Sequence, residues 1–145
     1  MNITASFIEL QTGEGIALHD LMPGVRDAVV CSGVKNGFVT ITSQHTTTAI
    51  AINENEERLV DDVKAFLARL IPSSDRYLHN DIELRDCPKD EPKNAHSHLA
   101  AMLLGSSEVV AIVEGELVLG QYQSVMLYEL DGPRQRKVNV QVYGE

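Results

Sequence analysis

Four of the five histidines stand where an imidazole could do chemistry. His45 lies in a polar break between two apolar stretches, His79 lies in a long polar segment, and His96 and His98 form an HxH pair ahead of a predicted helix. Three neutral imidazoles with an open fourth position make a catalytic zinc site, where the metal polarises an oxygen or activates water. The histidines therefore predict a metal centre. The simpler alternative for His45 is a strand-end histidine bonded to a threonine hydroxyl.

The HxH pair is constrained by the geometry of a helix. Positions i and i+2 on a helix diverge by about 200°, so their side chains face nearly opposite directions. We expect only one of His96 and His98 to point into a given site, unless His96 lies ahead of the first helical turn.

A polar turn at 129–134, ELDGPR, carries the second group of candidates. Asp-Gly-Pro alone would reverse the chain, yet Arg134 and then Arg136 add two guanidinium groups, which bind phosphate or carboxylate well. Ser106 is a further available donor. These groups predict a site for a small anion, against the alternative of a solvated turn whose arginines pair with nearby acids.

Acidic side chains near these groups have two possible uses. Glu54 and Asp131 could act as a base, add an oxygen ligand or orient an imidazole. Glu54 could equally be an acid that favours the first turn of a helix. Together with the histidines and arginines, these acids predict metal-assisted chemistry on a small anionic molecule.

The elements that must position these groups are mostly strands. Alternation of apolar and polar residues predicts strands at 2–10, 16–18, 37–42, 109–113 and in two parts of 121–143. Helical spacing predicts helices at 25–34 and 56–70 and a short third helix that ends at Gly105. Between Ser43 and Thr48 the apolar positions change parity, which requires a broken or bulged strand around His45.

Several finer expectations follow from the same patterns. Residues 2–18 and 121–143 each read as a hairpin, and the continuous apolar run at 109–113 suits a strand buried on both faces. Asn53 or Asn55 is expected to cap the second long helix. The third helix is expected to bury its larger apolar side chains, which are Leu99, Met102 and Leu103. Cys31 is expected to be a small core residue.

The whole chain limits the class of protein. Its length of 145 residues suits one domain, residues 1–145. A net charge of −9 repels nucleic acid, no apolar run is long enough for a membrane span, and no secretion signal is apparent at the start. Two cysteines outside any CxxC spacing suit a reducing compartment. We therefore expect a cytoplasmic protein with no membrane or nucleic-acid partner.

Four sequence blocks resemble the YjbQ-like family, whose members are often described as secondary thiamine-phosphate synthases. The blocks are HTTTAIAINENE from His45, HND from His79, NAHSHLAAMLLGSS from Asn94 and GELVLGQYQSVMLYELDGPR from Gly115. The resemblance implies an α+β, mostly β, jelly-roll-like sandwich with about three flanking helices. It also implies a homotrimer with a histidine site near the subunit boundaries.

The resemblance further implies an activity, which is the joining of a pyrimidine diphosphate to a thiazole phosphate. The expected cofactor is a divalent metal ion at the histidines, zinc, and Mg²⁺ is a possible counter-ion for the diphosphate. The metal ligands implied by the resemblance are His45, His79 and His98. The predicted catalytic residues are Arg134, which matches the family's ELDGPR arginine, and the acids Glu54 and Asp131, which are candidates from their residue type and position. The predicted substrate-binding residues are Asn53, Ser106, Gln123, Arg134 and Arg136. The resemblance implies the last three, with Tyr122 in place of the family's tryptophan beside Gln123. Two alternatives stay open: a metal-dependent hydrolase of a small phosphorylated or acylated metabolite, and a non-catalytic trimer that binds a metal or metabolite.

Overall fold

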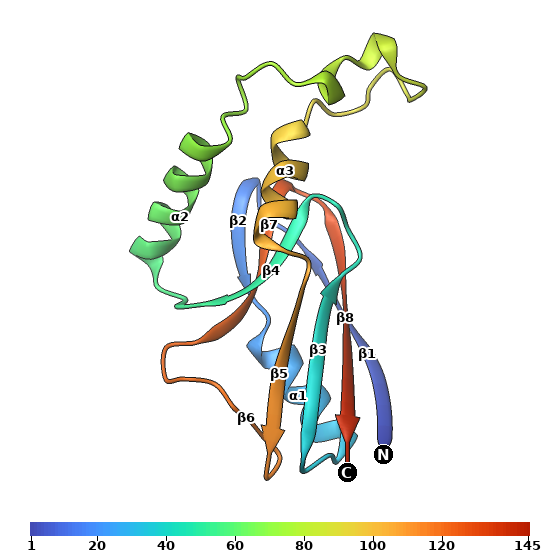
Figure 1. Ribbon diagram of the computed structural model, residues 1–145, viewed down its shortest axis with the longest axis vertical. Coiled ribbons are helices and arrows are strands. Elements are labelled where there is room, and N and C mark those ends of the chain that lie inside the picture. Colours follow the sequence, from blue (N-terminus) through green and yellow to red (C-terminus); the bar gives the residue numbers. More distant parts are fainter.

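The computed structural model, which describes residues 1–145, contains two antiparallel β-sheets and three α-helices (Figure 1). The five-stranded sheet has the order β1-β8-β3-β5-β6, and the three-stranded sheet has the order β2-β7-β4. The strands are β1 (Asn2–Gln11), β2 (Gly15–Asp20), β3 (Gly37–Ser43), β4 (Thr48–Asn53), β5 (Ser107–Val113), β6 (Glu116–Leu117), β7 (Ser124–Gly132) and β8 (Gln135–Gly144). The predicted α+β, mostly β, sandwich-like fold with about three helices is confirmed.

The three helices are α1 (Met22–Ser32), α2 (Glu57–Leu70) and α3 (Ala95–Leu104), and two short 3₁₀ turns interrupt the long segment before α3. The helix α1 ends where Gly33 adopts a left-handed φ of 70°, a conformation that favours glycine. The cap of α2 is Glu56, whose carboxylate accepts from two backbone N–H groups, so the predicted Asn53 or Asn55 cap is wrong. None of these helices has the length and apolar character needed to cross a membrane.

The main core lies between the two sheets and against α1. The alternation of Val138, Val140 and Val142 along β8 places all three side chains in this core, as the period-two pattern predicts. A second, smaller apolar cluster joins the three-stranded sheet to α2 and α3, with Leu67 of α2 and Leu130 of β7 among its members. The smaller cluster holds α3 against the end of β7 that carries the polar turn.

Consecutive strands change sheets at one end of the molecule. The strand β1 pairs only with β8, and β2 pairs only with β7, so the predicted hairpin at 2–18 is wrong. The predicted hairpin at 121–143 is also wrong, because β7 pairs with β2 and β4 whereas β8 pairs with β1 and β3. The break at 43–48 likewise carries the chain from β3 into β4 of the other sheet, which confirms the predicted break around His45. Three such crossings, at 11–15, 43–48 and 132–135, lie close together.

Three predicted burial patterns differ from the structure. The helix α3 buries small residues, among them Ala100 and Ala101, and exposes its larger ones, Leu99, Met102 and Leu103. Alanine allows the helix backbone to approach the sheet closely, which a stripe of leucines would prevent. The strand β5 buries only one face, because Val109 and Val113 are exposed. Cys31 is exposed rather than in the core.

Candidate functional site

A polar groove of about 370 Å³ lies at the end of the molecule where the three sheet crossings meet. The long segment before α3, the first turns of α3, the break after β3 and the turn after β7 all contribute to it. The residues that line it are Gln44, His45, Thr46, Thr47, Glu91, Pro92, Asn94, His98, Asp131, Arg134 and Arg136. Of the predicted site residues, the groove brings together two histidines, one acid and both arginines.

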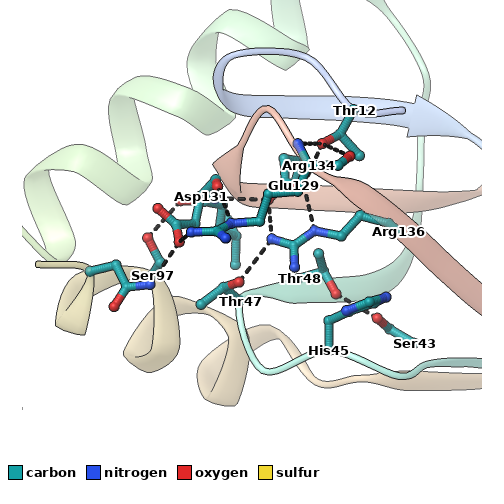
Figure 2. Close-up of polar contacts among 12 residues, drawn as sticks. Thr12, Ser43, His45, Thr47, Thr48, Ser97, Glu129, Asp131, Arg134 and Arg136 are labelled. Carbon is teal, nitrogen blue, oxygen red and sulfur yellow. Dashed lines mark hydrogen bonds and ion pairs between the residues drawn. The ribbon is translucent and has the colours of Figure 1, made fainter. Parts of the chain in front are cut away.

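A buried ion pair between Glu129 and Arg136 lies beneath the surface of the groove and supports it. Glu129 is completely buried and Arg136 is 5% exposed. The Arg136 Nε donates to Glu129 Oε2 and its Nη2 donates to Oε1, both at 2.7 Å, in a bidentate contact. The Thr12 hydroxyl also donates to Oε2 at 2.6 Å, and the Asp131 backbone N–H donates to Oε1 at 2.8 Å. Figure 2 shows the Arg136 guanidinium held between Glu129 and Thr47.

The Glu129 carboxylate stays ionised because of these donors. Burial alone would raise its pKa, but hydrogen bonds from Arg136, Thr12 and the Asp131 backbone outweigh burial and lower the pKa. The second terminal nitrogen of Arg136, Nη1, makes no hydrogen bond within the chain and is not enclosed. Arg136 is therefore mainly a structural residue, which still presents the two N–H donors of Nη1 to the groove.

Arg134 is held differently from Arg136. Its Nη2 donates to Asp131 Oδ2 at 2.9 Å and its Nε donates to the Asp131 carbonyl at 3.0 Å. The Asn94 amide donates to the same Oδ2 at 2.7 Å. The Arg134 side chain is 42% exposed, so this pair is partly solvated and the guanidinium stays accessible. Asp131 thus positions a partly exposed cation at the groove.

The imidazole of His45 is oriented by the backbone of β8. Its Nε2 accepts a hydrogen bond from the Lys137 N–H at 2.8 Å, which leaves the proton of the neutral ring on Nδ1. Burial lowers the pKa of His45, and the positive charge of Arg136 lowers it further, against a smaller opposing effect of Glu129. The alternative partner, a threonine hydroxyl, is not used. His45 is therefore a fixed, neutral imidazole.

His98 lies on α3 beside His79 of the long segment. The two rings make an edge-to-face contact with centroids 4.7 Å apart. Burial lowers the pKa of His98, with smaller contributions from His79 and Arg85 in the same direction, while Asp131 and Glu91 oppose the shift. His98 is therefore neutral near pH 7 and can donate or accept one hydrogen bond at each nitrogen.

The three predicted metal ligands do not form a three-histidine site within one chain. No three histidine, cysteine, aspartate or glutamate side chains are arranged to hold one metal ion. Nε2 of His45 is already occupied by the Lys137 N–H, and Nε2 of His79 is enclosed without a hydrogen-bond partner next to His98. The residues of a single chain therefore do not fit a tetrahedral zinc site with three protein ligands.

A second hollow of about 460 Å³ adjoins the groove. It shares His45, Thr46 and His98 with the groove, and it continues along α3 toward Ser106. Its lining is less polar than that of the groove and consists of His45, Thr46, Thr48, His98, Ala101, Met102, Gly105 and Ser106. Two hollows of different polarity thus share the two histidines.

Three predicted site residues lie elsewhere in the chain. Asn53 and Glu54 follow the far end of β4, where Asn53 pairs with Ser124, whereas Thr48 at the near end pairs with Glu129. Five residues of strand span roughly 17 Å, so neither residue reaches the groove of its own chain. Gln123 is exposed and accepts a hydrogen bond from the Gly120 N–H at 2.7 Å in a local turn.

Some residues of the site were not predicted. Thr12 contacts Glu129 across 117 positions of sequence, and Asn94 contacts Asp131 across 37. No local pattern indicates contacts between residues so far apart. The run of threonines after His45 was a usable signal for Thr47, because hydroxyls beside an irregular strand end are typical partners of a buried cation.

The fold and the groove define a mostly β protein with a site lined by histidines and arginines. The family described as "UPF0047 protein YjbQ-like" matches residues 6–145, and the chain belongs to this family. A UPF0047 protein of Methanothermobacter thermautotrophicus is 38% identical over 145 residues, which cover 100% of this chain and 95% of that protein. A UPF0047 protein of Archaeoglobus fulgidus is 35% identical over 133 residues, which cover 92% and 96%.

Solved structures agree with this membership. A YbjQ-like protein of unknown function from Sulfolobus solfataricus superposes with a TM-score of 0.89 at 35% identity and covers 99% of both chains. An uncharacterised YjbQ/UPF0047 protein from Clostridium acetobutylicum superposes with a TM-score of 0.85 at 33% identity and covers 95% of this chain and 99% of that chain. These similarities establish the fold and family.

Proposed function

We propose that the protein is a transferase that joins a pyrimidine diphosphate to a thiazole phosphate, as a thiamine-phosphate synthase does. The observation that carries this proposal is the meeting of two hollows at His45 and His98. The groove offers two guanidinium groups to phosphate oxygens, and the adjoining hollow offers Ala101 and Met102 to an uncharged ring. A reaction between two substrates needs two such regions that share a border.

The bond changes of this reaction suit the groups in the groove. The bond between the pyrimidine methylene carbon and the diphosphate oxygen breaks, and the oxygen keeps the electron pair. The lone pair of the thiazole nitrogen forms the new bond to the same carbon, so no proton transfer is needed for bond formation. Arg134 and the unpaired Nη1 group of Arg136 would stabilise the departing diphosphate. His98, which is neutral, would hydrogen-bond the substrates at the border of the two hollows.

Local charge supports binding of an anion despite the overall charge. The chain carries a net charge of −9, so its long-range field repels phosphate. The carboxylates of Glu129 and Asp131 are each bonded to an arginine, and the hydrogen bonds of Glu129 use both of its oxygens. The remaining N–H groups of both arginines are therefore the strongest unpaired donors at the groove.

Hydrolysis of a small phosphorylated or acylated metabolite is the second candidate. Asp131 favours it, because a carboxylate in the groove beside His98 could accept a proton from an attacking water. Glu54 is too far along β4 to do so within its own chain. A non-catalytic binding protein would use the same groove without turnover.

We further propose a cytoplasmic homotrimer in which neighbouring subunits together complete a zinc site that a single chain does not form, with Mg²⁺ on the diphosphate. The exposed side chains of Leu99, Met102 and Leu103 on α3 support self-association, because they form an apolar strip beside the second hollow. Metal analysis of tag-free protein tests the zinc proposal, and His45→Ala, His79→Ala and His98→Ala are expected to bind less metal than His96→Ala does.

The experiment that tests the proposed reaction is release of diphosphate with the two substrates supplied together or separately. A synthase releases diphosphate and forms thiamine phosphate only when both substrates are present, and Arg134→Ala should lose most of this activity. Release of phosphate from either compound alone would instead support the hydrolase. Binding of the compounds without any product would support a binding protein.

A further inference from the structure

A third hollow, of about 220 Å³ and separate from the first two, lies between α2 and α3. Its walls are mostly apolar, and none of its lining residues is aspartate, glutamate, lysine or arginine. The lining residues are Ile16, Leu67, Ala68, Ile71, Pro72, Ser73, Ser74, His96, Ser97, Ala100 and Leu130. We refer to it as the His96 pocket.

His96 is the polar group of this pocket that has no other role in the chain. Its imidazole makes no hydrogen bond to protein, its Nδ1 is enclosed without a partner, and its Nε2 is not enclosed. A polar group among apolar walls that lacks a partner is costly, and a ligand that bonds to it removes that cost. The histidine is therefore free to recognise a ligand.

The position of His96 separates this pocket from the groove. His96 and His98 lie on the same helix about 200° apart, so they face different sides of α3. His98 lines the groove and the adjoining hollow, while His96 lines neither. The HxH pair thus serves two regions rather than one.

We propose that the His96 pocket binds a small, neutral heteroaromatic molecule, which packs against the apolar side chains between α2 and α3 and forms a hydrogen bond with His96. The lack of charged side chains disfavours an ion, because an ion would be desolvated without a counter-charge. The volume is below the roughly 300–1,000 Å³ of pockets for drug-sized molecules, which limits the ligand to one fused ring system.

The pocket is also tied to the strand that forms the groove. The Ser97 hydroxyl donates to the Leu130 carbonyl at 2.6 Å, and Leu130 lies between Glu129 and Asp131 on β7. Ser97 and Leu130 both line the pocket. A ligand in the His96 pocket would contact the residues that hold α3 in place. The ligand itself would not contact substrates bound in the groove.

The test is calorimetric titration of the full-length protein with benzimidazole, which is neutral above pH 7 and carries one N–H donor and one acceptor nitrogen. The wild-type protein should bind it saturably. His96→Phe keeps the ring but removes both nitrogens and should weaken binding by about fivefold, the value of one hydrogen bond. Ala68→Leu should abolish binding, because Ala68 lines the pocket from the exposed side of α2.

Two controls separate this pocket from the groove and from effects on folding. Ala65→Leu changes an exposed alanine of the same helix that does not line the pocket and should bind benzimidazole like the wild type. His98→Ala should also bind it normally. Absence of saturable binding, or equal binding by wild type, Ala68→Leu and His96→Phe, would overturn the proposal. Loss of binding in His98→Ala alone would assign the ring to the groove and would also overturn it.

Discussion

Replacing Arg136 with methionine tests the buried ion pair beneath the groove. The change keeps much of the side-chain volume but leaves the fully buried Glu129 carboxylate without its two 2.7 Å donors from Arg136. Removing one partner of a buried pair typically costs about 3–5 kcal/mol, because the other charge stays buried without compensation. We expect the free energy of unfolding at pH 7, measured by urea denaturation, to fall by about this amount.

The pH dependence of this loss follows from the pKa of Glu129. Hydrogen bonds from Arg136 help to keep that pKa low, so the variant carboxyl should protonate at higher pH than in the wild type. The wild-type protein keeps the stability from its ionised Glu129 down to about pH 4.5 and loses it only at lower pH, whereas in the variant the buried carboxyl takes up a proton between pH 7 and about pH 4.5, which relieves the cost of its buried charge. The difference in unfolding free energy between the two proteins should therefore shrink from pH 7 to about pH 4.5.

Two further variants make this prediction decisive. The double variant Glu129→Gln/Arg136→Met has no unpaired charge and should recover much of the lost stability. Arg134→Met removes the partly exposed pair with Asp131 and should cost no more than about 1 kcal/mol. A loss below 1 kcal/mol in Arg136→Met, or a loss that is the same at every pH and is not rescued, would refute the reasoning.

Three other predictions concern pH, packing and assembly. The lowered pKa of His98 means that the folded state binds fewer protons than the unfolded state below about pH 6.5, so the unfolding free energy should rise from pH 5 to pH 7. His98→Gln should reduce that slope in urea titrations, and an unchanged slope would contradict the assignment. Gly132→Ala should lower the unfolding free energy by about 1–3 kcal/mol or more, since a Cβ there would lie 2.0 Å from the Gly13 carbonyl oxygen; normal thermal stability would disprove this close approach. Met102→Glu should give a smaller particle by light scattering, while Val118→Glu, at another exposed apolar position, should not; the same mass for both would argue against self-association through α3.

The strands and helices could be predicted because their patterns are local. Alternation places Val138, Val140 and Val142 on one face, and the change of parity marks the break that holds His45. The partners of the strands could not be predicted in the same way. Strands joined by a short turn usually pair, and here each of the turns at 11–15 and 132–135 instead carries the chain from one sheet to the other.

Site residues could be predicted where the residue type and its local sequence indicate the chemistry. They were missed where the role of a side chain depends on partners distant in sequence. His45, His98 and Arg134 stand out by type and local context, and the structure brings them to one groove. The structural use of Arg136 follows from Glu129 and Thr12, and Thr12 lies more than a hundred positions away in sequence. Large apolar residues on α3 were assigned to the core because periodicity shows which residues share a face but not which face packs on the sheet.

The most direct test of the proposed site is calorimetric titration with inorganic diphosphate at low ionic strength. Wild-type protein should bind it saturably, and Arg134→Met should bind at least tenfold more weakly while keeping its fold, since its ion pair adds little stability. Arg26→Met, which removes an equal charge on α1 away from the groove, should bind like the wild type. Equal affinity in all three proteins, or no binding by any, would contradict the assignment of the groove as a phosphate-binding active site.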